Sequence, residues 1–533
     1  MPSTNLWDAI VIGAGHNGLT AAGYLAKSGK RVLVLERRDV VGGAVLTEEF
    51  HPGFRNSAAA YVVSLLRPEV IEELELRRHG FETLRMGGSF GAFADGKSLL
   101  LTGDENADRA EVARFSNRDW EAMASLGAML RKAGDLVRAE MLEEPPRLSG
   151  GGLADLLGGL RLGRGLKRFS PAERHQFLQL FLTPVGAILD RTFDSDAVKT
   201  MYAATATAGA FVSLDEPGSA INLLHLGIGE VESERGAWHL PKGGMGTVTQ
   251  SMAKAAQSFG AEIRVSAPVE TILIEAGRAV GARLESGEEI RARAILSNAD
   301  PKRTFLGLVG EKRLPPEFAA GIQTYRMASG SFRINFALSG LPEFASRPGA
   351  AICPQHRAFI RMVSGYAAYD EAFRAAKRGE LPADPILDAV IPTAIDPSLA
   401  PPGCHILSIL AQHYPYRLAH GRAWEQARGE AVEGILAAAE RYIPNIRKLV
   451  LGWRAYSPHD LERVFGLTGG DVYHGQLDPG QIFSLRPHPA AAQYRTPVKA
   501  LYLCGAGAHP GGGVSGAPGR NAAMRVLKDW RRL

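Results

Sequence analysis

Three glycines near the start of the chain have the spacing of a dinucleotide-binding turn. Gly13, Gly15 and Gly18 form G-x-G-x-x-G within VIGAGHNGL. The first permits a tight turn, the second lets a pyrophosphate approach the backbone, and the third allows a helix to pack closely on a strand. The N-terminus of that helix would offer unpaired N–H groups to the phosphates. The motif alone is a weak signal, so its surroundings decide the interpretation.

An acidic residue follows at a suitable distance. Glu36 ends a second apolar run, RVLVLE, 18 residues after Gly18. A carboxylate in this place accepts hydrogen bonds from a ribose 2′-hydroxyl, whereas it would repel a 2′-phosphate. The alternative is an ordinary glycine turn followed by a surface glutamate. The combined pattern favours FAD or NAD over NADP.

A second glycine pair follows this acidic residue. Gly42 and Gly43 would let the backbone run close to a cofactor, and the hydroxyl of Thr47 could reach a phosphate. A simple glycine loop explains the pair equally well. The densest glycine segment lies near the end of the chain and includes Gly505 and Gly511, Gly512 and Gly513.

The elements that must position these residues follow from the apolar pattern. Strand, glycine turn, helix and strand over the first forty residues predict a β-α-β unit with a right-handed crossover. Residues 70–199 are mostly helical in pattern, residues 243–296 return to α/β, and strand-like runs include 331–338, 405–410 and 498–504. We therefore predict one discontinuous cofactor domain (1–70, 236–305 and 490–533) and a substrate domain with a helical insert (71–235 and 306–489).

Composition narrows the class of protein. The 533 residues carry 61 basic and 56 acidic side chains and only three cysteines. The charge is too balanced for a dedicated nucleic-acid binder, and the isolated cysteines exclude a disulfide scaffold or zinc ribbon. The first apolar stretch lacks a basic leader, and no apolar run reaches the length of a membrane span. We expect a cytoplasmic protein that binds no nucleic acid and no metal.

Longer segments carry a family resemblance. ERRDVVGGAVLT resembles the second fingerprint of the flavin amine-oxidase and phytoene-desaturase superfamily, although amine oxidases usually have arginine where this chain has Ala44. LYLCGAGAHPGGGVSGAPGRNAA is similar to the carboxy-terminal flavin segment of bacterial phytoene desaturases. HPGFRNSAAAYVVSLLRPEV, GAWHLPKGGMGTVTQSMAKAAQ and ILSNADP resemble the pyridine nucleotide-disulfide oxidoreductase domain-containing protein 2 family. The resemblance spans nearly the whole chain.

This resemblance implies a fold, a cofactor and a reaction. The fold would be α/β, with a Rossmann-like, p-hydroxybenzoate-hydroxylase-like FAD domain and an inserted mixed α+β substrate domain. The backbone of Val269 would contact the adenine edge, and the carboxy-terminal glycines would touch the isoalloxazine. His509 could act there as a proton acceptor or donor, or simply cap the turn.

The expected function is FAD-dependent desaturation, saturation or isomerisation of a hydrophobic, isoprenoid or lipid-like substrate. The alternatives are a flavin amine or amino-acid oxidase and a flavin-bound interaction protein with vestigial redox activity. Gly243–Gly246 has neither the spacing nor a preceding strand for a second dinucleotide turn. We therefore expect oxygen or a quinone, rather than NADPH, to exchange electrons with the flavin.

One further segment could contact a membrane. Leu153, Leu156, Leu157 and Leu160 have helical spacing and are followed by basic residues in LADLLGGLRLGRGLKR. Such an amphipathic segment could lie on a membrane surface or cover a lipid entrance. Four glycines weaken the helix, and packing between domains is the interpretation that we prefer. Peripheral membrane contact is the alternative.

Overall fold

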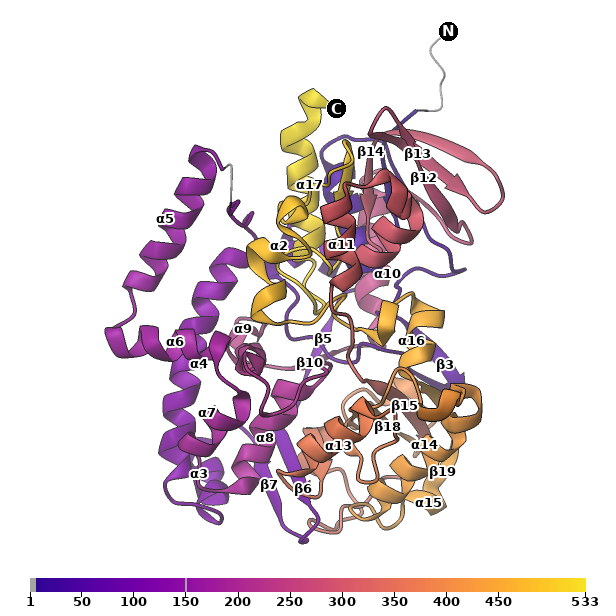
Figure 1. Ribbon diagram of the computed structural model, residues 1–533. Coiled ribbons are helices and arrows are strands. Elements are labelled where there is room, and N and C mark those ends of the chain that lie inside the picture. The colour runs from indigo at the N-terminus through magenta and orange to yellow at the C-terminus, as the bar shows by residue number, and fades with distance from the viewer. Residues whose placement is uncertain (1–5, 149–150) are drawn as a thin grey trace.

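The computed structural model describes residues 6–148 and 151–533. Residues 1–5 and 149–150, which belong to the predicted segments 1–70 and 71–235, lie outside the described residues. The described chain forms two seven-stranded sheets and a group of helices beside them (Figure 1). The α/β fold class is confirmed.

The first sheet unites three distant parts of the chain. Its strands run in the order β11-β2-β1-β14-β13-β12. Strand β20 pairs with the last residues of β14, which β13 leaves unpaired. The pairs among β11, β2, β1, β14 and β20 are parallel, whereas β12, β13 and β14 form an antiparallel meander. The bounds are β1 Trp7–Ile12, β2 Val32–Leu35, β11 Glu262–Arg264, β12 Val269–Glu275, β13 Arg278–Leu284, β14 Glu289–Ser297 and β20 Leu501–Leu503.

Burial explains this arrangement. The apolar runs of β1 and β2 are almost fully buried, as strands covered on both faces must be. Helices α1 (His16–Lys27), α10 (Gly246–Ser258) and α17 (Ala517–Asp529) pack together beside the sheet. Their small residues, such as Ala21, Ala22 and Ala255, are fully buried and allow this close packing. The sheet thus joins strands from all three predicted segments of the cofactor domain, while the boundaries themselves stay a prediction.

The second sheet lies at the other end of the molecule (Figure 1). Its order is β19-β15-β18-β17-β16-β6-β7, and only the pair of β16 with β6 is parallel. The bounds are β6 Ser89–Phe93, β7 Ser98–Leu101, β15 Phe332–Leu338, β16 Phe359–Val363, β17 Ile386–Val390, β18 His405–Gln412 and β19 Val450–Tyr456. Helix α14 (Trp424–Glu440) packs its apolar side against this sheet in a core that includes Phe332 and Phe336.

The helical part of the chain was predicted only in outline. Residues 105–228 form α3 Glu105–Ala113, α4 Asp119–Met141, α5 Leu153–Lys167, α6 Pro171–Leu182, α7 Val185–Thr192, α8 Asp196–Thr207 and α9 His225–Ile228. Residues 70–199 are mostly helical, as expected, but they also contain the short strands β5 (Thr83–Arg85), β6 and β7. These strands are short, and β6 is held by its distant partner β16, a pairing that local pattern does not reveal.

Helix α5 packs against the rest of the molecule, but not through the four leucines that the sequence singled out. Leu153, Leu156, Leu157 and Leu160 are exposed by 73%, 60%, 56% and 49%. Helix α5, which projects at the side of the molecule in Figure 1, packs through Leu162 and Leu166 instead. No helix in the described part of the chain is both long enough and apolar enough to cross a bilayer.

Candidate functional site

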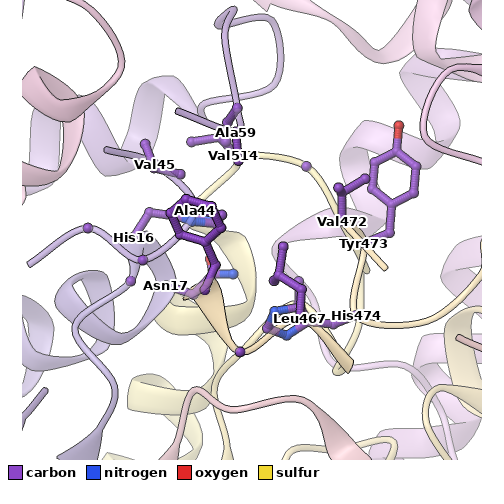
Figure 2. Close-up of a pocket in the computed structure, with 18 of the residues that line it drawn as sticks. His16, Asn17, Ala44, Val45, Ala59, Leu467, Val472, Tyr473, His474 and Val514 are labelled. Atoms are coloured by element: carbon purple, nitrogen blue, oxygen red, sulfur yellow. The ribbon is translucent and has the colours of Figure 1, made fainter. Parts of the chain in front are cut away.

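A cavity of about 710 Å³ is lined by residues of both sheets. We call one part of its lining the nucleotide end, defined by Gly13, Gly15, His16, Glu36, Gly42, Gly43 and Val269. We call the other part the sheet end, defined by Tyr61, Arg333, Phe359, Arg361 and Asp388. Figure 2 shows part of this cavity, with side chains from the amino-terminal part of the chain, such as His16, and from the carboxy-terminal part, such as Tyr473, around it.

The first glycine turn has the geometry that its spacing predicts. Gly13 has a φ of +95°, a region that other residues rarely adopt. A Cβ on Gly18 would lie 2.1 Å from the Gly13 carbonyl oxygen, so only glycine allows this close packing of helix on strand. Gly15 is the N-cap of α1 and provides no side-chain cap, which leaves backbone N–H groups available for a ligand.

Glu36 is fixed by the backbone of the same turn. Its side chain is buried, with one carboxylate oxygen accepting from the Ala14 N–H at 2.8 Å and the other from the Arg38 N–H at 3.0 Å. A carboxylate carries about four lone-pair sites. Glu36 can therefore hold the turn and still accept a hydrogen bond from a ribose hydroxyl.

The second glycine pair also lies in the cavity wall, but the nearby threonine does not. Gly42 and Gly43 have φ values of +125° and +55°. The Thr47 hydroxyl accepts from the Gly246 N–H at 2.8 Å and lies 3.2 Å from the Gly243 carbonyl oxygen, where it caps the start of α10. This geometry favours a structural role for Thr47.

The central glycines also follow a strand, which the sequence did not indicate. Strand β10 (His239–Pro241) immediately precedes them and pairs with β5 (Thr83–Arg85) in a separate two-stranded sheet. The expectation of no preceding strand was wrong. The strand does not join the parallel sheet, so it does not create a second dinucleotide-binding unit there.

The carboxy-terminal glycines divide into one lining residue and several packing residues. Gly513 lines the cavity and has a φ of +95°. A Cβ on Gly505 would lie 2.6 Å from the Asn298 carbonyl oxygen, and one on Gly512 would lie 2.3 Å from the Tyr473 ring. A Cβ on Gly511 would meet Leu477 and Arg486. Contact with a flavin ring stays a prediction for this segment, with Gly513 as its best-placed member.

His509 is buried outside the described lining of the cavity. Its Nε2 lies 2.9 Å from the Glu140 carbonyl oxygen on α4, and its ring packs edge-on against Phe483. Burial lowers its pKa to about 4, so the imidazole is neutral at physiological pH. These contacts favour a packing role and give the predicted proton transfer no geometric support.

Several polar atoms of the nucleotide end have no protein partner. His16 Nε2, Asn17 Oδ1 and Arg38 Nη1 are buried without a hydrogen bond to any described residue. Burial lowers the pKa of His16, and also that of the nearby His474, to about 4. Unpaired donors and acceptors beside an uncapped helix N-terminus fit a dinucleotide with phosphate, ribose and heterocyclic groups.

The sheet end contains charged residues that the sequence analysis did not single out. Arg333, Arg361 and Asp388 lie in β15, β16 and β17, whose residues are otherwise largely apolar and all buried. Aromatic rings complete this wall: Phe359 lies 6.0 Å from Tyr61 and 5.0 Å from Trp238 between ring centroids. A single charge inside an apolar strand (FRINFAL, FIRMV, ILDAV) was the signal that could have indicated these residues.

A protein-family comparison identifies the class to which this fold and site belong. The sequence model for flavin-containing amine oxidoreductases matches residues 18–331. The chain therefore belongs to that family, and it is an FAD-dependent oxidoreductase. The glycine turns and Glu36 are the parts of the structure that suit this cofactor.

Individual relatives refine the placement within this family. The chain is 38% identical to pyridine nucleotide-disulfide oxidoreductase domain-containing protein 2 of Mus musculus, over 99% of this chain and 94% of the relative. It is 27% identical to a lycopene-forming phytoene desaturase of Pantoea ananas, over 97% and 98% of the two chains. The family resemblance stated from the sequence is confirmed.

Solved structures support the fold. Putrescine oxidase bound to putrescine matches with a TM-score of 0.63 at 17% identity, over 99% of both chains. Identity at this level speaks for the shared architecture, a Rossmann-like FAD domain with an inserted substrate domain. It says nothing of this protein's substrate.

Proposed function

We propose that the protein desaturates, saturates or isomerises a hydrophobic, isoprenoid or lipid-like molecule in an FAD-dependent reaction. The observation that carries this proposal is the continuous cavity, in which a wall of Tyr61, Trp238 and Phe359 adjoins the nucleotide end. Aromatic rings provide a large apolar contact area for a hydrocarbon chain. The similarity to a phytoene desaturase supports the same substrate class.

The chain's own residues would bind and orient rather than supply strong acid–base catalysis. Bound FAD would provide the electron-accepting or electron-donating group, as cofactors do in such reactions. The imidazoles of His16 and His474 are neutral because burial lowers their pKa to about 4. Leu467 and Val472 contribute apolar surface to the cavity wall beside Tyr473 (Figure 2).

The charge of the sheet end argues against a simple amine as substrate. Two guanidinium groups, those of Arg333 and Arg361, and one carboxylate, that of Asp388, line this part of the cavity. A protonated amine would meet a net positive charge in a poorly solvated space, where repulsion is strong. Ala44, in the position where amine oxidases usually carry arginine, agrees with this preference.

Anaerobic reduction of the bound flavin tests the substrate class. We expect phytoene or a geranyl compound to bleach the visible absorbance of the oxidised flavin, whereas putrescine and cyclohexylamine leave it unchanged. A saturase or isomerase would instead convert the geranyl double bonds when the flavin is supplied reduced. Reduction by the amines alone would establish the oxidase alternative, and inertness toward every compound would favour an interaction protein.

The electron acceptor belongs to the same proposal. We expect oxygen or a quinone to reoxidise the reduced flavin, because among the described residues only the G-x-G-x-x-G turn of Gly13, Gly15 and Gly18 directly follows a strand of the first sheet. NADPH should reduce the flavin far more slowly than turnover. Stopped-flow reduction by NADPH at the turnover rate would contradict this part of the proposal.

Peripheral membrane contact through α5 is also proposed. The exposed leucines of α5 adjoin Arg164, Lys167 and Arg168, which are exposed too. Vesicles containing phosphatidylserine should sediment the protein more efficiently than pure phosphatidylcholine vesicles do. The double variant Leu156→Ser with Leu157→Ser should abolish this sedimentation, whereas equal recovery of variant and parent would contradict the contact.

A further inference from the structure

Three charged residues lie in one row across the second sheet. Arg333 on β15 is directly opposite Leu410 on β18, which is opposite Asp388 on β17, and Asp388 is opposite Arg361 on β16. Residues directly opposite one another on neighbouring strands have their side chains on the same face. All four residues line the cavity, so the row forms part of its wall.

Arg333 is buried without an ion partner. Its exposed fraction is 1%, and one of its terminal nitrogens donates to the Ser408 hydroxyl at 2.9 Å. Its Nε and Nη1 have no hydrogen-bond partner, and no carboxylate of a described residue lies within ion-pair distance. The guanidinium stacks on the Tyr61 ring, 4.5 Å from its centroid. Burial without a counterion lowers the pKa of Arg333 to about 10.

Arg361 is arranged in a similar way. It is 6% exposed, and it donates to the hydroxyls of Thr205, at 3.0 Å, and Ser89. Its Nε has no partner among the described residues, and the guanidinium lies 4.8 Å from the centroid of the Phe359 ring. The hydroxyls are neutral, so they satisfy part of each guanidinium's hydrogen bonding without balancing its charge.

Asp388 balances only one of these two cations. Its Oδ2 accepts from Gln412 Nε2 at 2.5 Å, and its Oδ1 has no partner. The row therefore has a net positive charge in a space removed from bulk water. An unpaired buried charge is costly unless a ligand supplies its counterion. The unused N–H groups of both arginines thus specify an anionic ligand.

We propose that the sheet end binds a carboxylate group of the substrate, so that the substrate is an acid with an apolar body. The unpaired N–H groups of Arg333 and Arg361 would donate to the carboxylate, and the apolar body would lie against Tyr61, Phe359 and Trp238. This inference rests on the proposed function and narrows its substrate class to fatty-acid-like or isoprenoid acids. The phosphates of the cofactor are assigned elsewhere, to the turn of Gly13 and Gly15 on the first sheet.

Isothermal titration of the FAD-loaded protein with octanoate and octanamide tests this assignment. The two probes share a chain length and differ in charge at one end. We expect octanoate to bind at one site per chain and about 10- to 100-fold more tightly than octanamide, the effect expected for hydrogen bonds to a charged group. Equal affinities for the two probes would overturn the proposal.

Variants of the row locate the binding group. Arg333→Met should weaken octanoate binding about 10- to 100-fold and leave octanamide binding within about twofold. Arg333→Lys, which keeps the positive charge, should retain most of the affinity for octanoate. This variant replaces Arg333→Met in the test if the methionine variant does not fold. Asp388→Asn should tighten octanoate binding. Arg454→Met, on edge strand β19 and outside the described lining, is the matched control and should behave like the parent protein.

The FAD content of each variant separates this proposal from other outcomes. Loss of FAD from Arg333→Met or Arg361→Met would assign these arginines to the cofactor and overturn the carboxylate site. Unchanged octanoate binding in both variants would also overturn it. Binding is measured without turnover, so this test does not depend on a reaction at the flavin. Failure of every apolar compound to react with the flavin would contradict the proposed function, but octanoate binding could still be measured. If a neutral apolar compound reacted with the flavin and octanoate bound no more tightly than octanamide, the proposed function would stand and the carboxylate site would be wrong.

Discussion

The two ends of the cavity offer different physical means of recognising a ligand. At the nucleotide end, we expect recognition through free backbone N–H groups and through glycines that let a ligand approach, beside Glu36, which accepts from the N–H groups of Ala14 and Arg38. At the sheet end, we expect recognition through charged side chains in the middle of buried strands. One end is shaped by the absence of side chains and the other by their presence.

This difference has an energetic consequence. Backbone sites are almost insensitive to side-chain identity except where a Cβ would block the approach, so glycine substitutions should be the harmful ones there. The arginine row carries uncompensated charge, so its contribution depends on charge and on solvent access. Substitutions and changes of pH should therefore act on the two ends separately.

The largest effect is expected for Glu36→Arg. The change removes the acceptor of two backbone N–H groups and places an unpaired cation in a buried site. We expect an FAD affinity at least about 100-fold lower, because each hydrogen bond to a charged group contributes about 1.5–3 kcal/mol. The measurement is the ratio of flavin to protein after gel filtration. Octanamide binding at the sheet end, tested at saturating FAD, should persist. If the variant keeps stoichiometric FAD, the assignment of the nucleotide end is wrong.

A smaller effect is expected for Gly15→Val. A Cβ at this position would come within 2.8 Å of Asn298 Nδ2, and the rest of the side chain would occupy the space above the start of α1. Asn298 can move aside, so the protein should fold and lose about 10- to 100-fold in FAD affinity, in line with an overpacking cost of about 1–3 kcal/mol.

Gly159→Ala is the control for this glycine substitution. Gly159 lies in α5, and a Cβ there would meet no atom within 4 Å. Its FAD content should equal that of the parent protein. Equal FAD content in Gly15→Val and Gly159→Ala would show that the nucleotide end tolerates side chains. The proposed difference between the two ends of the cavity would then be wrong.

The smallest effect is a pH dependence confined to the sheet end. Burial raises the pKa of Asp388 to about 6, although the nearby Arg361 opposes the shift. Below that pH the carboxyl is neutral and both guanidiniums are uncompensated. Octanoate is an ordinary aliphatic carboxylate and stays mostly ionised at pH 5.5. Its affinity should therefore rise about 3- to 10-fold from pH 8 to pH 5.5, the size expected for one charge at partial screening.

The groups around Asp388 identify the source of this effect. Arg361 and Gln412 act on it from neighbouring strands, Arg333 lies one strand further along the row beyond Leu410, and Tyr61 and Tyr369 interact with it electrostatically. Both tyrosines have a raised pKa, so neither ionises in this range. Asp388→Asn should abolish the pH dependence in calorimetric titrations and leave FAD affinity constant. A pH dependence that survives in this variant would point to another group.

Much of the nucleotide end could be predicted from sequence because its determinants are local. The turn of Gly13, Gly15 and Gly18 lies between two strands separated by one helix, and apolar runs of strand length revealed both strands. The roles of Thr47 and His509 could not be predicted in the same way. The Thr47 hydroxyl is hydrogen-bonded to the Gly246 N–H, about 200 residues away along the chain, and the His509 imidazole to the Glu140 carbonyl oxygen, about 370 residues away.

The amino-acid sequence by itself determined the family, the first glycine turn and the α/β class, because spaced glycines and buried strands constrain the backbone within a few dozen residues. Only the tertiary structure decided that Arg333, Asp388 and Arg361 form one row. Strands β15, β16 and β17 follow one another along the chain, but β18 lies between β15 and β17 in the sheet. A shift of one residue in register would turn any of these side chains to the opposite face. Whether a buried arginine has a counterion is likewise a property of strands brought together from distant parts of the chain.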